Sequence, residues 1–151
     1  MKHTSLNDKW GKEALSLGWV AVPTSLLFLQ SQLGISPTGL NVLMQLIMHW
    51  WGSEGRPHPS QEAMAERMGV SPRTVQREIA ALVAMGLLRK KHTPVHHPTY
   101  RGRNLYDLSP LVAKLNEHAI PLNHSLKNKR EHAQHALTDE DVIPLTNEPS
   151  P

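Results

Sequence analysis

The chain has 151 residues, enough for one domain with a hydrophobic core, and 39% of them are hydrophobic. It contains no cysteine, which excludes a disulfide framework and a cysteine-ligated zinc site and is compatible with a reducing compartment. No apolar run is long enough for a signal peptide or a membrane span, so we expect a soluble, cytoplasmic protein that does not bind membranes.

The formal net charge is only +3, but the charges are unevenly distributed. Between Arg67 and Arg103 lie eight of the sixteen Lys and Arg residues, with Glu78 as the only acid. After Arg130 there is no Lys or Arg. A basic centre followed by an acidic end suits a protein that binds nucleic acid. The acids of that end are Asp139, Glu140, Asp141 and Glu148.

The first segment, residues 1–17, is polar with a weak helical pattern and predicts a frayed arm or a short helix. Gly18 ends it. The apolar run Trp19–Val22 that follows predicts a short strand. Residues 25–33 then predict a helix that ends at Gly34.

Ser36 followed by Pro37 marks the start of another helix, which is apolar nearly all round as far as Trp51. Such a helix must be buried on more than one side. One interpretation is the central core helix of the domain. The other is that part of it also forms a dimer interface together with residues 25–33, because a small domain hides only some of these side chains internally.

The most informative stretch is residues 59–88. Ser60 is placed to cap a helix, and Gly69 lies where the chain must leave that helix in a left-handed conformation. Ser71 followed by Pro72 repeats the helix-start signal. The pattern therefore predicts two helices joined by a tight turn.

The second of these helices has two different faces. Its apolar residues recur at helical spacing and predict a face turned toward the first helix; they are Val75, Ile79, Leu82 and Val83. The other face is polar and basic. Arg pairs with guanine, Gln pairs with adenine and Thr contacts the thymine methyl, so this face suits base edges in a major groove. The candidate base-contacting residues are Arg73, Thr74, Gln76 and Arg77.

The segment SQEAMAERMGVSPRTVQREIAALVAMGLL resembles the winged helix-turn-helix family, especially members found in phage and plasmid regulators and replication proteins. The resemblance covers residues 18–108. The four-residue step from Val75 to Ile79 departs from the three-residue step of repressor-type motifs and favours the winged subclass. The alternative, an ordinary helical hairpin in a globular core, leaves the basic face unexplained. The resemblance implies a mainly α fold with a small β-wing (α+β), and makes Trp19–Val22 the first strand of the wing sheet.

Residues 87–92 and 103–108 predict two strands joined by an irregular hairpin, because two prolines and a glycine lie between them. The resemblance to the winged helix-turn-helix family implies that this hairpin is the wing. Cations near its tip, with His96 and His97, are placed to lie against phosphates or in a minor groove. The alternative is a solvated hairpin with incidental charges. The residues assigned to phosphate contacts are Ser71, Lys90, Lys91, Arg101 and Arg103.

Ser109 followed by Pro110 predicts a last helix, through about His118. The polar, proline-containing residues 120–151 predict a mostly disordered acidic tail. The tail is either a solvated segment, or a segment that binds a protein partner or competes for the basic face. The predicted organisation is thus an arm (1–17), a winged helix-turn-helix domain (18–119) and a tail (120–151).

Ten histidines raise the question of a metal site, but His92, His96 and His97 have no carboxylate or cysteine beside them. No Gly-rich phosphate loop, nucleophile elbow or paired-carboxylate signature occurs. We therefore expect no metal, no cofactor and no catalytic residue, and do not expect an enzyme.

Together these patterns predict a protein that binds double-stranded DNA sequence-specifically, acts as a homodimer and represses or otherwise regulates transcription on the bacterial nucleoid. Two alternatives stay open. In one, the same domain serves replication initiation or maintenance of a plasmid or phage. In the other, the winged domain is a protein-interaction module whose second helix docks onto a partner.

Overall fold

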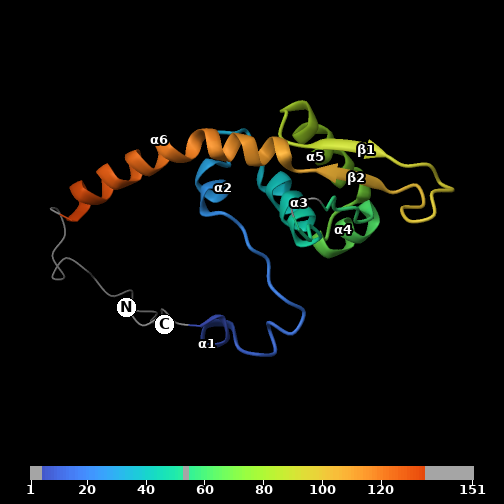
Figure 1. The fold of residues 1–151 in the computed structure, drawn as a ribbon, viewed down its shortest axis with the longest axis horizontal. Helices are drawn as coiled ribbons and strands as arrows, with labels where there is room; N and C mark the ends of the chain where they lie inside the picture. The colour runs from blue at the N-terminus through green and yellow to red at the C-terminus, as the bar shows by residue number, and fades with distance from the viewer. Residues whose placement is uncertain (1–4, 53–54, 135–151) are drawn as a thin grey trace, which may run out of the picture. The chain divides into compact units, whose positions relative to one another are not determined.

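The computed structural model describes residues 5–52 and 55–134, which Figure 1 draws in colour. The chain forms two compact units, divided between Leu115 and Asn116. In the part of the chain that is described, no helix is both long and apolar enough to cross a membrane.

The architecture of the described residues is mainly helical with one two-stranded antiparallel sheet, as predicted (Figure 1). The helices are α1 (Leu6–Trp10), α2 (Thr24–Leu29), α3 (Pro37–Met48), α4 (Gln61–Met68), α5 (Pro72–Ala84) and α6 (Ser109–Gln134). The strands are β1 (Arg89–His92) and β2 (Asn104–Asp107).

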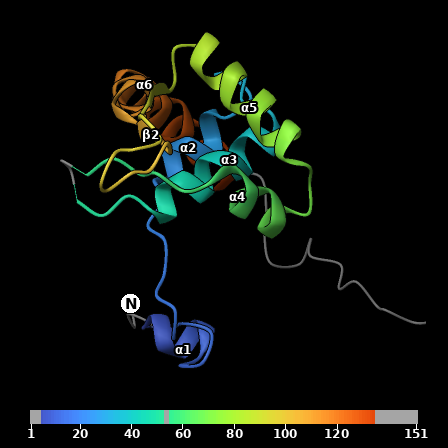
Figure 2. The ribbon, with the colours of Figure 1, turned by 90° about the vertical axis from the view of Figure 1, so that its right-hand side faces the viewer.

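The core lies where α3 meets α4 and α5, which Figure 2 shows as neighbours. Val42, Leu43 and Leu46 of α3 are fully buried. Val75 and Ile79 of α5 are also fully buried. Burial of these side chains removes apolar surface from water and is the main term that holds the three helices together. Helix α3 is therefore the central core helix.

Each of these three helices begins at a capping serine. The hydroxyls of Ser36, Ser60 and Ser71 accept hydrogen bonds from backbone N–H groups three residues further along. Helix α4 ends at Gly69, which has a left-handed φ of 67°. The two helices and the tight turn predicted for residues 59–88 are thus confirmed.

One apolar side chain of α5 is less buried than predicted. Val83 is 38% exposed, because it lies one residue beyond the buried Leu82 and points about 100° away around the helix. Val70, in the turn, is half-buried.

The segment Trp19–Val22 does not form the predicted first strand of the sheet. Within residues 5–52 and 55–134 the sheet contains only β1 and β2. The N–H of Tyr106 in β2 donates instead to the carbonyl of Pro57, at an N···O distance of 3.0 Å. The loop before α4 therefore occupies the position beside β2, and its prolines prevent a regular strand ladder there.

The helix predicted over residues 25–33 is shorter in the structure. Helix α2 ends at Leu29, and turns continue to Gly34, whose φ is 78°. Gly34, predicted to end the helix, terminates these turns instead.

The hairpin is in register from Arg89 opposite Asp107 to His92 opposite Asn104. The irregular loop predicted between the strands is present at residues 93–103. It contains turns but no strand.

Helix α6 starts at Ser109, as predicted, but it continues to Gln134 instead of ending near His118. Pro121 lies inside it. A proline in a helix removes one donor and disfavours the helix by about 3 kcal/mol, but the residues after it include good helix formers such as Leu, Lys, Arg and Glu. The expectation of disorder therefore does not hold for residues 120–134. Residues 135–151, with the acidic tail, lie outside the described residues.

Candidate nucleic-acid interface

The face of α5 that points away from the core is polar and exposed. Arg73, Gln76 and Arg77 are all exposed, and no side-chain hydrogen bond or ion pair joins them to the rest of the described chain. Val75 and Ile79 anchor the opposite face in the core. These three long polar side chains are therefore held on a rigid helix and are free to contact a ligand.

The hydroxyls of Ser71 and Thr74 are engaged with each other. Ser71 Oγ accepts a hydrogen bond from the Thr74 backbone N–H at 3.2 Å and lies 3.0 Å from Thr74 Oγ1. Thr74 is half-buried, unlike the other candidate base-contacting residues. Ser71 is thus the cap of α5, and a phosphate at this hydroxyl would have to share it with the cap.

The single acid of the basic stretch is tied to α3. Glu78 Oε2 accepts a hydrogen bond from Ser36 Oγ at 2.9 Å. The same hydroxyl accepts from the Gly39 N–H at 2.9 Å and so caps α3. This arrangement joins α5 to the start of α3 and keeps the carboxylate on the core side of α5, away from Arg73 and Arg77.

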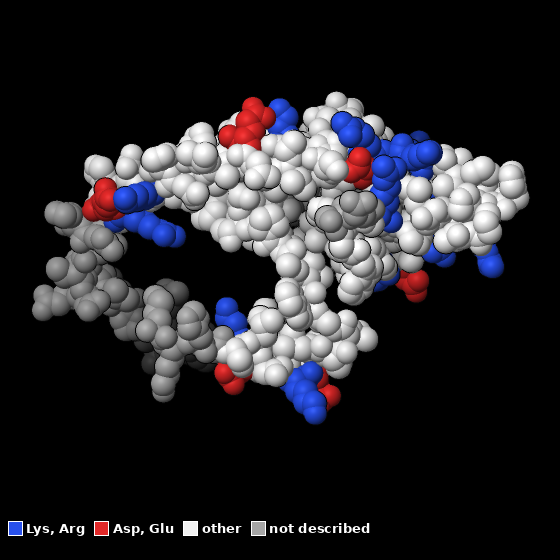
Figure 3. All heavy atoms as spheres, viewed as in Figure 1, with Lys and Arg blue, Asp and Glu red and all other residues white. Residues whose placement is uncertain are grey.

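Cations of β1 cluster with one cation from the loop before α4. Arg56, Arg89, Lys90 and Lys91 line a cavity of about 300 Å³ together with Asp107. Arg89 Nη1 lies 3.6 Å from Asp107 Oδ2. Figure 3 shows Lys and Arg side chains gathering over this part of the molecule. The cluster offers several positive charges to a polyanion.

Asp107 is the only acid in this cluster, and its charged form is stabilised. Ser109 donates to Asp107 Oδ1 from its hydroxyl at 2.6 Å and from its backbone N–H at 2.9 Å. These two hydrogen bonds, with smaller contributions from Arg56 and Arg89, hold the pKa of Asp107 below its usual value. Asp107 is therefore ionised at neutral pH and offsets one of the neighbouring positive charges.

Arg101 and Arg103 lie in a different cavity, of about 290 Å³, between the hairpin and the start of α4. Gln61 and Tyr106 also line it. The Tyr106 hydroxyl is 3.5 Å from Gln61 Nε2, and this weak contact links β2 to α4. The cavity is polar, open and flanked by two guanidinium groups, which suits an anionic ligand.

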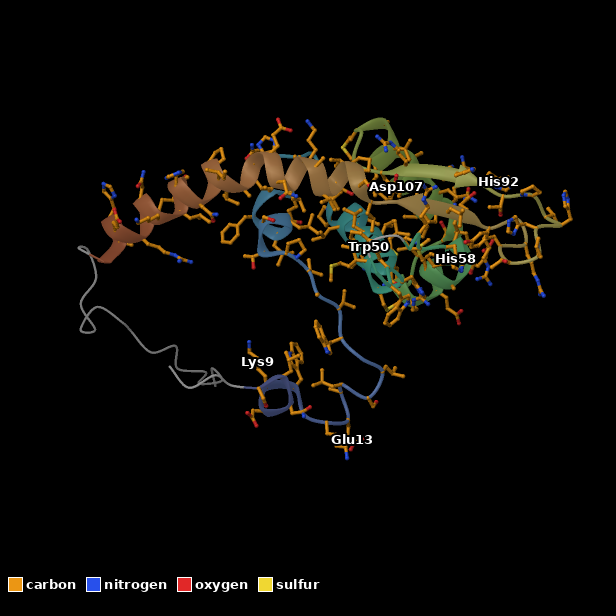
Figure 4. All side chains as sticks on the ribbon, in the orientation of Figure 1. Lys9, Glu13, Trp50, His58, His92 and Asp107 are labelled. Carbon is orange, nitrogen blue, oxygen red and sulfur yellow. The ribbon has the colours of Figure 1, made fainter. Side chains whose placement is uncertain are left out.

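His58 and His92 lie on separate elements. Figure 4 shows His92 on β1 and His58 on the segment before α4. His92 Nδ1 is 3.0 Å from Asn104 Oδ1, its partner across the sheet. Nowhere in residues 5–52 and 55–134 does a group of three or more His, Asp and Glu residues lie in a position to hold a metal ion.

Arg67 is not available as a free cation. Its Nε donates to Gln45 Oε1 at 2.7 Å, and its Nη2 lies 3.3 Å from His49 Nε2. Burial lowers the pKa of His49, and the positive charge of Arg67 and the nearby His58 lower it further. His49 is therefore neutral at neutral pH and can accept from Arg67, which braces α4 against α3.

The residues predicted to contact phosphates thus fall in three places. Lys90 and Lys91 belong to the β1 cluster, Arg101 and Arg103 to the cavity beside α4, and Ser71 to the start of α5. Neither cavity includes the exposed side chains of α5.

Sequence reasoning missed Arg56. It lies in a turn-rich loop, and nothing in the sequence indicates that this loop runs beside β2 and adds a cation to the β1 cluster. The only available signal was a lone cation close to the motif.

Residues 33–88 match the family model described as "Helix-turn-helix domain". The match begins just before α3, includes α4 and α5, and ends where β1 and its hairpin follow. The chain contains a winged helix-turn-helix domain. The predicted resemblance is therefore confirmed, and this similarity to helix-turn-helix domains supports DNA binding.

A solved structure supports the same fold. The crystal structure of the N-terminal domain of DnaD protein from Geobacillus kaustophilus HTA426 is similar to this chain, with 27% sequence identity and a TM-score of 0.55. The similarity covers 77% of this chain and 93% of that one, so it extends well beyond the helix-turn-helix itself. No curated protein matches the sequence.

Proposed function

We propose that the winged helix-turn-helix domain binds double-stranded DNA sequence-specifically with α5 in the major groove, and that the protein regulates transcription as a repressor on the bacterial nucleoid. The observation that carries this proposal is the exposed, uncommitted set Arg73, Gln76 and Arg77 in the first turns of a helix whose other face is buried. The first turns of a recognition helix are those that reach base edges.

Base contacts and phosphate contacts have different roles in this proposal. Base contacts give specificity, and phosphate contacts give affinity and fix the position of the domain on the duplex. The base-contacting residues are Arg73, Thr74, Gln76 and Arg77. The phosphate-contacting residues are Ser71, Lys90, Lys91, Arg101 and Arg103, to which the β1 cluster adds Arg56.

We assign the active form to a homodimer. Leu27 and Phe28 on α2 are 49% and 53% exposed, and Trp51 is 81% exposed. Exposed apolar surface of this kind favours association. A two-fold dimer presents two α5 helices to half-sites about one DNA turn apart, roughly 34 Å.

A second candidate role is replication initiation or maintenance of a plasmid or phage. It uses the same DNA contacts, and the similarity to the DnaD domain over 93% of that chain supports it. The position of the binding sites separates the two roles. Repeated sites near an origin would support replication, whereas sites that overlap a promoter would support repression.

Selection from a random duplex pool, combined with a salt titration, tests DNA binding itself. The selected sequences should converge on one motif, and the logarithm of the affinity should fall linearly with the logarithm of salt concentration, by about 0.9 per phosphate contact. Binding without a salt dependence would contradict the phosphate contacts and favour the protein-docking alternative. Salt-dependent binding without a common motif would contradict sequence-specific recognition.

A further inference from the structure

The loop between β1 and β2, residues 93–103, has a defined fold. The Thr93 hydroxyl donates to the Arg103 carbonyl at 2.6 Å, and the Gly102 N–H donates to the Pro94 carbonyl at 2.9 Å. Arg101 has a φ of 47°, and no other described non-glycine residue has a positive φ. A left-handed arginine persists only where the surrounding hydrogen bonds hold the backbone in place.

His97 closes the turn at the end of this loop. Its Nδ1 accepts hydrogen bonds from the backbone N–H groups of Thr99 and Tyr100, each at 3.1 Å. Its carbonyl accepts from the Arg101 N–H at 3.1 Å. Side chains of Asn and Asp hold turns in the same way, by accepting from amides a few residues ahead. Residues 98–101 thus form one turn that the imidazole caps.

The hydrogen bonds to Nδ1 depend on the protonation state of the ring. A ring nitrogen accepts a hydrogen bond only through its lone pair, so the proton of the neutral His97 ring must be on Nε2. In the imidazolium form both ring nitrogens carry a hydrogen. The Nδ1 hydrogen would then point at the amide hydrogens of Thr99 and Tyr100, and both hydrogen bonds would be lost.

We propose that His97 is a positioning residue, which folds the hairpin tip while its ring is neutral, places Arg101 and Arg103, and releases the tip on acidification. Arg101 is the last residue of the capped turn. The Arg103 N–H donates to the Tyr100 carbonyl at 2.8 Å, so its backbone is also fixed by the turn. The effect on DNA affinity rests on the proposed function, whereas the effect on the turn does not.

The groups around this imidazole do not replace the lost hydrogen bonds. The Tyr100 ring lies 4.8 Å from the imidazole and 5.0 Å from His58, measured between ring centroids. His96 is the exposed neighbour in the chain. Arg101, Arg103, His92 and Glu62 line the cavity beside the loop. Glu62 is the one carboxylate in this set, and in the described part of the chain no hydrogen bond or ion pair joins it to His97.

Two variants separate the loss of the hydrogen-bond acceptor at position 97 from the change in charge of the ring. His97→Asn keeps a side-chain oxygen that can accept from the same two amides and has no charge to gain. His97→Ala removes the acceptor at every pH. Measurements at pH 7.5 and pH 5.5 compare both variants with the wild type.

Nuclear magnetic resonance of the full chain without DNA tests the turn. At pH 7.5, one-bond and long-range proton–nitrogen correlations should place the ring proton of His97 on Nε2. Between pH 7.5 and 5.5 the amide resonances of Thr99 and Tyr100 should shift together in the wild type and stay in place in His97→Asn. A ring proton on Nδ1 at pH 7.5, or the same shifts in both proteins, would overturn the proposal.

Duplex binding tests the consequence. At high ionic strength, which screens the charge that His97 itself gains, the ratio of the wild-type Kd to the His97→Asn Kd should rise about threefold to tenfold from pH 7.5 to 5.5, as expected for the loss of one or two hydrogen bonds. His97→Ala should bind weakly at both pH values. A constant ratio would overturn the link to DNA, and if neither protein binds duplex, the proposed function fails while the resonances still decide the turn.

Discussion

Arg77 and Lys91 are matched probes of the two kinds of DNA contact, because both are exposed cations on regular elements. Arg77→Ala should weaken binding to the preferred site by about 1–3 kcal/mol and relax the preference at one base pair. Lys91→Ala should weaken binding to all sequences alike and reduce the salt slope by about one. Competition binding with single-base variants measures both effects. An equal loss on every sequence for both variants would contradict the assigned roles.

We expect the hydrogen bonds between Asp107 of β2 and Ser109 of α6 to be sensitive to acid. Hydrogen bonds from Ser109 hold its folded-state pKa below the usual 3.8, so its contribution is fully present above about pH 4 and is lost as pH falls through the folded-state value. Asp107→Asn removes this charged acceptor and should therefore lower the free energy of unfolding at pH 7. The expected loss is only on the order of 1 kcal/mol, because solvent screens this partly exposed group. Urea unfolding of both proteins at several pH values measures the difference.

The variant of Asp107 retains an oxygen that can accept from Ser109, so the comparison isolates the charge. The stability difference between the two proteins should shrink toward zero below pH 4. A difference that stays constant from pH 7 to pH 3 would show that the carboxylate charge is not the stabilising feature.

At the scale of elements, the tight turn between α4 and α5 depends on the left-handed backbone of Gly69. A side chain there would meet no atom within 4 Å, so crowding is not the limitation. Gly69→Ala should destabilise the fold by about 1–2 kcal/mol, because an L-residue with a β-carbon is strained at this φ. Gly69→Asn should cost less, because Asn tolerates the left-handed region. Chemical unfolding compares the two, and equal costs would exclude backbone strain as the cause.

Helix starts and the exposed face of α5 could be predicted from the sequence because both are local properties. Ser60 and Ser71 cap amides only three residues away, and the spacing of the apolar residues in α5 fixes its polar face. The base-contacting candidates follow directly from that spacing. The capped turn at His97 was not predicted, because imidazole is seldom an acceptor for amides two and three residues ahead.

Properties that depend on distant partners could not be predicted. The strand expected at Trp19–Val22 failed because strands need a neighbour, and the position beside β2 is occupied by Pro57. The cluster of Arg56 with the β1 cations depends on the same contact. The length of α6 was underestimated because Pro121 is a local signal, whereas the helix continues through the favourable residues beyond it.

At the scale of the whole molecule, association through α2 is open to a direct test. The combined substitution Leu27→Gln and Phe28→Gln should shift the protein from dimer to monomer in sedimentation equilibrium, because it removes exposed apolar surface without disturbing the buried Leu26 and Leu29. Affinity for a duplex with two half-sites should fall at least tenfold, as for loss of bivalent binding, while affinity for one half-site stays unchanged. An unaltered sedimentation profile would exclude this face of α2 as the dimer interface.

The contact between Pro57 and Tyr106 has a further consequence for the hairpin. A free sheet edge recruits strands from other molecules and leads to aggregation. Here one edge abuts a loop whose prolines offer no N–H group, and the other belongs to β1, where Arg89, Lys90 and Lys91 repel a second copy of the same strand. The cations that suit a phosphate backbone therefore also protect the small sheet from edge-to-edge polymerisation, so the hairpin can remain exposed even when the protein is concentrated.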